Sequence, residues 1–223
     1  MPTPPTIDTD TELSAVNSIL GAIGQSPVTA LGNVSSTTTT TAAGTTVTTN
    51  SYENPEVSFI YNILAEVNKD VQNEGWHFNT EKHVKVTPDP NGYLTLPVNT
   101  LRYDRNNDHF DRTVDVVVRN GRLYDLVDHT DVFTGDLLLD IVTLYPFEDL
   151  PNIFQRYITY RAAVRAATQL VSNPQLVVLL KEDEAKARAV CTEYECSQAD
   201  PSYFGLEHSS LYRAYQPYQA LSR

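Results

Sequence analysis

A change of hydrophobic period divides this sequence into two kinds of structure. Apolar residues recur every three or four positions in four segments, two before residue 76 and two after residue 148, as in amphipathic helices. In the stretch between them apolar and polar positions alternate, as in strands that bury one face. The pattern predicts an α+β protein: an antiparallel four-helix bundle with a small antiparallel β domain inserted into it and an extended C-terminal arm.

The four helical stripes have start and stop signals of their own. Thr9 is the expected cap of the first helix, Pro55 begins the second and Gly75 ends it, and Asn173-Pro174 separates the third from the fourth. The apolar positions are Leu13, Val16, Leu20 and Ile23; Val57, Ile60, Leu64, Val67 and Val71; Ile153, Tyr157, Tyr160, Val164, Ala167 and Val171; and Leu176, Leu180, Ala187, Cys191 and Tyr194.

The β region contains one strong hairpin signal. Residues 114–118 and 122–127 are short strand-like runs, and Asn120-Gly121 between them is the dipeptide that favours a type I′ turn. Trp76, the only tryptophan, stands where the second helix gives way to the β region, and we expect it to be buried there.

These boundaries predict four parts of the chain. Residues 1–75 form the first part of the bundle, 76–148 the inserted β domain, 149–197 the second part of the bundle, and 198–223 the arm. Within the first part, residues 35–50 are nearly all Ser, Thr and Ala, so we expect a mobile loop, or one that a partner orders, rather than a core element.

The arm has the aromatic content of a buried surface but no regular period. Its large apolar residues include Tyr203, Phe204, Leu211, Tyr212, Tyr215 and Tyr218. Such a segment either docks on another protein surface or folds back on its own bundle. A polar stripe of Arg161, Arg165 and Thr168 on the third helix is read either as a second partner contact or as simple exposure.

Composition restricts the class of protein. The formal charge of −12 argues against tight nucleic-acid binding, because affinity for the duplex comes mainly from Lys and Arg. The sequence has neither an apolar run long enough to span a bilayer nor a secretory signal, so we expect it to stay in the cytoplasm where it is made. Cys191 and Cys196 are expected to be ordinary thiols.

No catalytic, cofactor or metal site is predicted. Asp104, Asn106 and Asp108 imitate the start of a calcium loop, but His109 stands where that loop needs Gly. The five histidines lack paired metal-ligand spacing, and no phosphate-binding or nucleophile motif occurs. The acidic run 182–184 is expected to form helix-surface ion pairs, Glu182 with Lys186 and Glu184 with Arg188 among them.

The helices and the start of the β region resemble the tail tubular protein A family, the adaptors of short-tailed bacteriophages. The similar stretches follow the family's order along the chain and touch all four helices. They are Glu12 to Asn17 with Ile19-Leu20, Ile23-Gly24 and Pro27-Val28; Gly75 to Asn79; Leu150-Pro151 with Phe154, Tyr157 and Ile158; and Glu182 to Ala185 with Arg188, Cys191 and Glu193 to Glu195.

The resemblance implies a structural protein of the virion tail. Twelve copies would form a ring between the portal and the tail nozzle, with tail fibres attached nearby and the genome passing through without specific binding. The net acidity then either lets DNA slide past negative walls or only keeps the protein soluble. Two other readings are a virion-associated hydrolase of cell-wall or capsule polysaccharide and a head-completion adaptor on the portal.

Overall fold

The computed structural model describes residues 11–31, 35–40, 46–51, 55–105, 114–171 and 173–199. The described part of the chain falls into two compact units: the residues up to Val71 with Pro146–Glu193, and Gln72–Tyr145 with the residues from Tyr194 on. The described residues contain four α-helices and small antiparallel sheets, which confirms the α+β class.

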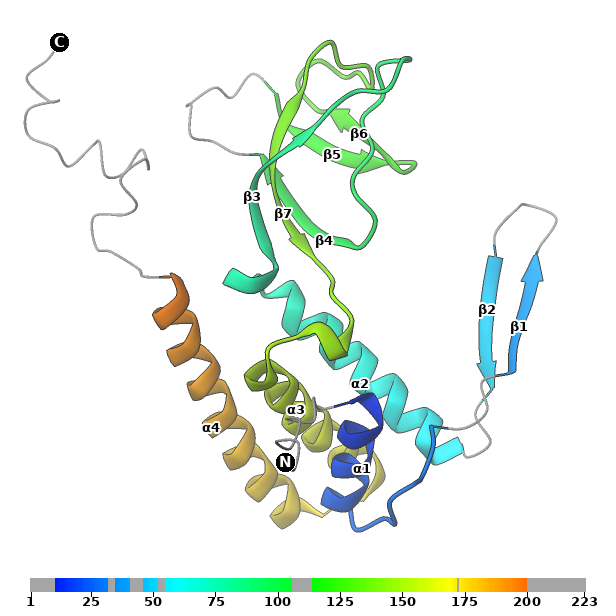
Figure 1. Ribbon diagram of the computed structural model, residues 1–223, viewed down its shortest axis with the longest axis vertical. Helices are drawn as coiled ribbons and strands as arrows, with labels where there is room; N and C mark the ends of the chain where they lie inside the picture. The colour runs from blue at the N-terminus through cyan, green and yellow to red at the C-terminus, as the bar shows by residue number, and fades with distance from the viewer. Residues whose placement is uncertain are drawn as a thin grey trace, which may run out of the picture. The chain divides into compact units, whose positions relative to one another are not determined.

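The four helices begin and end close to the predicted positions. They are α1 (Glu12–Ala22), α2 (Pro55–Asn73), α3 (Asn152–Leu170) and α4 (Pro174–Ala199), as Figure 1 shows. In the first unit α1 packs against α3. Four alanines of α3 are buried, and their small side chains let the neighbouring helices approach closely: Ala162, Ala163, Ala166 and Ala167.

Helices α1 and α4 each begin with a local side-chain cap. At α1 the cap is Thr11, whose hydroxyl oxygen accepts from Ser14 N at 3.3 Å. The predicted cap, Thr9, lies outside the described residues. At α4 the Asn173 carboxamide accepts from the backbone N–H of Gln175 at 3.1 Å, which explains why a new helix starts at Asn173-Pro174.

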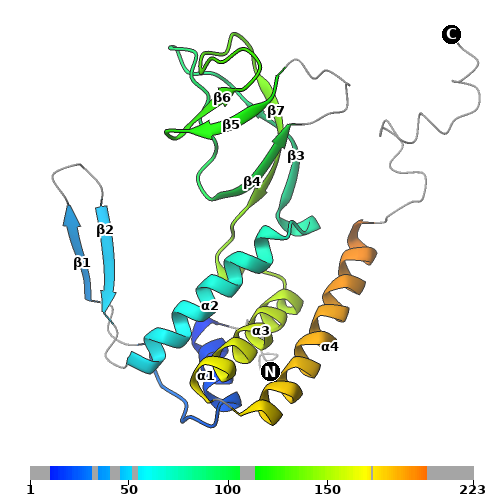
Figure 2. The ribbon, with the colours of Figure 1, turned by 180° about the vertical axis from the view of Figure 1, so that it is seen from behind.

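The second unit is built around a three-stranded antiparallel sheet. Its strands are β3 (Thr80–Val86), β4 (Thr100–Arg105) and β7 (Leu137–Thr143), in the order β3-β7-β4, which can be followed in Figures 1 and 2. The central strand β7 carries most of the buried residues of the sheet. The hydrophobic core of this unit consists of Val86, Leu94, Leu123, Leu137, Leu139 and Ile141.

The predicted hairpin is confirmed. β5 (Val116–Arg119) pairs antiparallel with β6 (Arg122–Asp125). Asn120 and Gly121 have φ angles of 52° and 76°, and a type I′ turn requires positive φ at both positions. The Val118 N–H donates to the Tyr103 hydroxyl of β4 at 2.8 Å, so the hairpin is linked to the main sheet.

The expectation of a loop at 35–50 is wrong for the residues that the structure describes there. β1 (Ser35–Thr40) and β2 (Thr46–Ser51) form an antiparallel pair whose register runs from Ser35 opposite Ser51 to Thr40 opposite Thr46. Thr is β-branched and favours extended backbone, so a Thr-rich stretch can pair with itself without contributing large apolar side chains.

The segment that joins α2 to β3 buries the only tryptophan. Gly75, at φ +80°, ends α2 in the left-handed conformation that favours glycine. Trp76 is 9% exposed, which confirms the predicted burial, and the short 3-10 helix His77–Asn79 follows. A second 3-10 turn, Phe147–Asp149, precedes α3.

Candidate assembly surfaces

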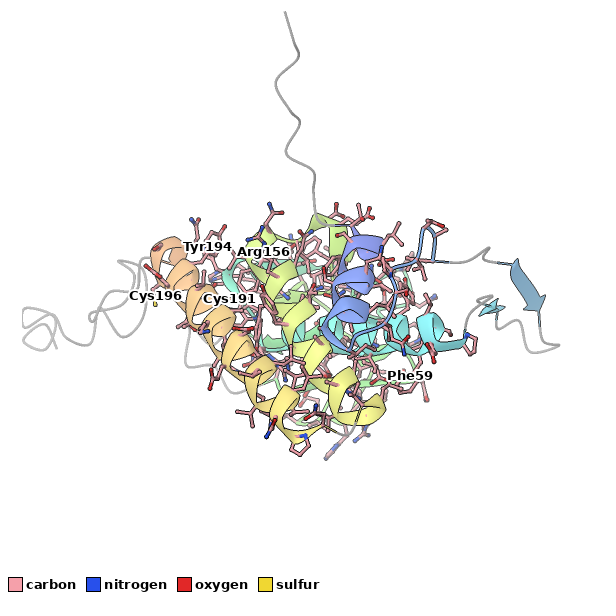
Figure 3. The ribbon with its side chains drawn as sticks, turned by 90° about the horizontal axis from the view of Figure 1, so that it is seen from below. Phe59, Arg156, Cys191, Tyr194 and Cys196 are labelled. Carbon is pink, nitrogen blue, oxygen red and sulfur yellow. The ribbon has the colours of Figure 1, made fainter. Side chains whose placement is uncertain are left out.

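One side of α3 presents an arginine and a tyrosine between two grooves. Arg156 and Tyr160 are four residues apart and therefore lie on the same side of the helix. Seen from below in Figure 3, α3 lies between α1 and α4, and a groove of about 350 Å³ toward α4 and one of about 240 Å³ toward α1 both include these two residues. The other residues that line the grooves are Ile153, Asp183, Lys186, Ala187 and Val190 toward α4, and Ser14, Ala15, Ser18 and Thr159 toward α1.

Helix α4 has an exposed apolar side. Cys191 is the only buried residue among those of α4 whose burial is described, and its Sγ lies 3.6 Å from the Ile153 carbonyl oxygen. Val178, Leu179 and Val190 leave 56%, 60% and 48% of their surface exposed. Apolar area of this kind on a helix is typical of a surface that another chain covers.

Residues of the predicted stripe on α3 make contacts within α3 and with α2. The Arg161 guanidinium donates to the Tyr157 hydroxyl at 3.1 Å. The Arg165 guanidinium forms ion pairs with Glu66, at 2.5 Å, and with Asp70, at 3.8 Å, both on α2. Arg165 therefore links α3 to α2, and 39% of its side chain stays accessible.

In the acidic run on α4, Lys186 pairs with a different carboxylate from the one predicted for it. Lys186 Nζ lies 3.1 Å from Asp183 Oδ1, three residues earlier, rather than pairing with Glu182. Both side chains are largely exposed, so the pair contributes little to stability.

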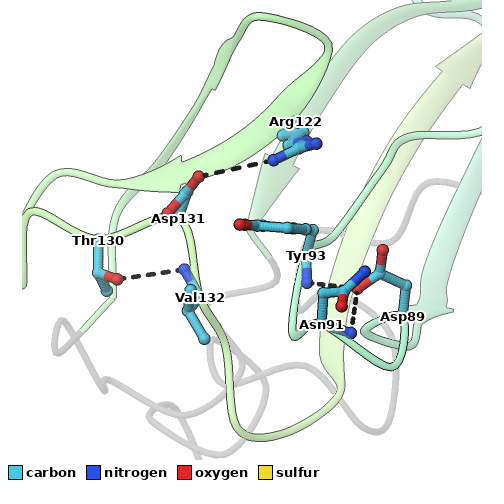
Figure 4. Close-up of polar contacts among 7 residues, drawn as sticks. All are labelled: Asp89, Asn91, Tyr93, Arg122, Thr130, Asp131 and Val132. Carbon is cyan, nitrogen blue, oxygen red and sulfur yellow. Dashed lines mark hydrogen bonds and ion pairs between the residues drawn. The ribbon is translucent and has the colours of Figure 1, made fainter.

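In the second unit the tip of the β5–β6 hairpin forms a pocket of arginine and tyrosine side chains. The pocket has a volume of about 430 Å³ and is lined by Arg119, Asn120, Arg122, Tyr124 and Asp131. Figure 4 shows Arg122 above the ring of Tyr93, with the Asp131 carboxylate beside the end of its side chain. The turn is predictable from the sequence, but the pocket was not predicted; its available signal is an arginine on each side of Asn120-Gly121.

The remaining residues singled out in the sequence either lie in other elements or fall outside the described part of the chain. Asp104, the first residue of the run that imitates a calcium loop, lies in β4, while Asn106 and Asp108 fall outside the described residues. No group of three or more His, Cys, Asp and Glu side chains in the described part of the chain could hold a metal ion. The arm residues Tyr203, Phe204, Leu211, Tyr212, Tyr215 and Tyr218 also lie outside the described residues. None of the described helices is long and apolar enough to cross a membrane.

Comparison with known proteins identifies a matching family model and a relative of similar sequence. The family model described as tail tubular protein matches residues 44–201. Tail tubular protein A of Klebsiella phage KP34 is 30% identical over 142 residues, which are 63% of this chain and 63% of that protein. The similarity thus spans less than two thirds of the relative's length, and the family match takes in parts of both compact units.

Proposed function

Because the chain belongs to the tail tubular protein family, whose members are structural components of the bacteriophage tail, we propose that it is a subunit of the adaptor ring between the portal and the tail nozzle. Twelve copies form the ring, tail fibres attach nearby, and the genome passes through its centre. The match of the family model to residues 44–201 is the observation that carries this proposal.

Ring closure requires a heterologous interface, in which one patch of a subunit meets a different patch on the next. The chain offers such dissimilar surfaces: the apolar side of α4, the Arg156–Tyr160 side of α3 and the arginine-rich hairpin tip. The four helices are proposed to form one antiparallel bundle, with 1–75 and 149–197 as its two parts and 76–148 as the β domain inserted between them.

The arm, residues 198–223, is proposed as an assembly element that docks on a neighbouring subunit or on the portal. Its aromatic side chains offer large contact area at low entropy cost. Arg161 and Arg165 are proposed as a further contact, since the part of Arg165 that stays accessible leaves donors for a partner. The protein is proposed to have no catalytic role, and its net charge of −12 suits a channel wall that does not retain DNA.

Electron cryomicroscopy of tails purified from virions tests this proposal. The expected result is a ring of twelve copies of this chain between portal and nozzle, identified by fitting the two compact units into the density. A ring on the portal without a nozzle contact would instead support a head-completion adaptor. Release of reducing sugars from cell-wall or capsule polysaccharide by the purified chain would favour a hydrolase and contradict a purely structural role.

A further inference from the structure

The hairpin tip of the second unit places two like charges directly opposite each other. In the β5–β6 register Arg119 lies directly opposite Arg122, so both side chains project from the same face of the hairpin beside the turn. Like charges at directly opposite positions destabilise a sheet. The arrangement therefore costs stability unless other groups compensate for it.

Each arginine is held by a tyrosine ring. The Cζ atom of Arg119 lies 4.2 Å from the ring centroid of Tyr124, its diagonal neighbour across the hairpin. The Cζ atom of Arg122 lies 3.8 Å from the ring centroid of Tyr93. Contact with an aromatic face fixes the plane of a guanidinium but does not consume its N–H donors, which point outward along the plane.

The positive charge at this tip is only weakly neutralised. Arg122 Nη1 lies 4.0 Å from Asp131 Oδ2, and both side chains are 47% exposed, so this ion pair is long and well solvated. Among the residues that the structure describes, no carboxylate lies within ion-pair distance of Arg119. A chain with a net charge of −12 thus keeps two adjacent arginines with spare donors at the mouth of a pocket of about 430 Å³.

Backbone contacts fix the position of Tyr93 and of the hairpin before any ligand arrives. The Asp89 carboxylate accepts from the backbone N–H of Asn91 at 2.9 Å and of Tyr93 at 2.8 Å, as Figure 4 shows. The Leu123 N–H donates to the Leu94 carbonyl at 2.8 Å, which ties β6 to the residue after Tyr93. A preformed site loses less entropy when it binds.

We propose that this pocket binds the carboxylates of an acidic peptide segment of a partner protein. Two planar guanidinium groups with free donors match a carboxylate, because the fork of each group can form paired charge-assisted hydrogen bonds. A nucleic acid is a poorer match, since affinity for phosphate backbones depends on many cations and two cannot offset the acidity of the chain. The tyrosine faces turned to the arginines are also already covered, so they cannot stack on bases.

NMR titration of the full chain with a capped tetraglutamate peptide tests the proposal. The side-chain Nε–H signals of Arg119 and Arg122 and the backbone amides of the hairpin should shift and saturate. Arg119→Gln/Arg122→Gln should weaken the binding at least about tenfold, because it removes charge-assisted hydrogen bonds. The control Lys69→Gln/Lys82→Gln removes the same number of positive charges at exposed positions on α2 and β3 and should bind the peptide as the wild type does.

Three results would overturn the proposal. One is the absence of saturable shifts at these arginines at millimolar peptide. Another is an equal loss of affinity in the lysine control, which would mean that net charge rather than the pocket attracts the peptide. The third is tighter binding of a single-stranded oligonucleotide than of the peptide, measured from the shifts of the same NMR signals, which would assign the pocket to nucleic acid. Arg119→Lys/Arg122→Lys checks for misfolding, because it keeps the charge and should retain part of the affinity while losing the planar fork.

Discussion

Replacement of Asn79 by alanine should strongly destabilise the second unit. Asn79 is fully buried between α2 and β3, and its side chain satisfies backbone groups on both sides of the turn. Its Oδ1 accepts from Trp76 N at 2.9 Å, and its Nδ2 donates to the carbonyl oxygens of Gln72 at 2.8 Å and Thr143 at 3.2 Å. Asn79→Ala removes all three hydrogen bonds at once.

The three losses are unequal. The Gln72 carbonyl also accepts from Gly75 N at 3.2 Å, so the loss there is small. The Trp76 N–H loses its acceptor in a buried position, which costs about 1 to 3 kcal/mol, and the weaker bond to Thr143 adds about 1 kcal/mol. Together they lower the free energy of unfolding by about 3 kcal/mol, which exceeds the effect of a typical surface substitution.

Urea denaturation followed by Trp76 fluorescence measures this change directly, because the only tryptophan lies in the affected segment. With an m-value of about 1.5 kcal/mol/M, the midpoint should fall by about 2 M. The matched control is Asn91→Ala, an exposed asparagine whose backbone N–H, not its side chain, bonds to Asp89; its effect should stay within about 0.5 kcal/mol. Equal midpoints for the two variants would refute the argument that the Asn79 side chain holds this segment.

Three further predictions concern other parts of the molecule. Burial, and then the nearby Glu81 carboxylate that accepts from its hydroxyl, raise the pKa of Tyr145 above its ordinary value of 10.0. The folded state thus favours the neutral phenol, and this contribution to stability is present below about pH 10 and is lost as the pH rises through the folded-state pKa of Tyr145. Tyr145→Phe should therefore reduce the loss of unfolding free energy at alkaline pH, and an unchanged pH profile of stability would contradict this. Gel shifts at near-physiological salt should show no complex of the purified chain with duplex DNA at micromolar protein, and a salt-sensitive complex at lower concentrations would argue against a non-retaining channel wall. Deletion of residues 200–223 should leave the thermal midpoint of the isolated chain nearly unchanged but abolish ring formation or portal attachment in a tail-assembly assay, whereas a midpoint many degrees lower would show that the arm belongs to the fold.

The features that the sequence predicted well depend on local physics. The helix that ends at Gly75 and the helix that starts at Asn173-Pro174 are determined by backbone conformation and by a side-chain cap within a few residues. The hairpin at Asn120-Gly121 is equally local, because two adjacent residues with positive φ define its turn.

The features that were missed depend on residues far apart in the chain. β4 contains Asp104, a residue type that is depleted in strands, and it is a strand because it pairs with β7, more than thirty positions later. The contact between Tyr93 and Arg122 joins a tight turn to a hairpin, and no period within either segment predicts it. The apolar stripe of α4 was expected to be a core stripe, yet Leu176 and Leu180 are only half-buried, since the pattern predicts which side is apolar but not how fully it is covered.

The position of β7 has a consequence for how the protein is made. Both neighbours of this strand, β3 and β4, precede it in the chain, and they hydrogen-bond to β7 rather than to each other. During synthesis the two earlier strands therefore leave the ribosome without their pairing partner, and the sheet cannot close until Leu137–Thr143 has also emerged. For that interval the nascent chain carries unpaired strand edges, which can pair wrongly with other copies of the chain made in the same infected cell. Translation of β7, the last strand of this sheet, ends that exposure.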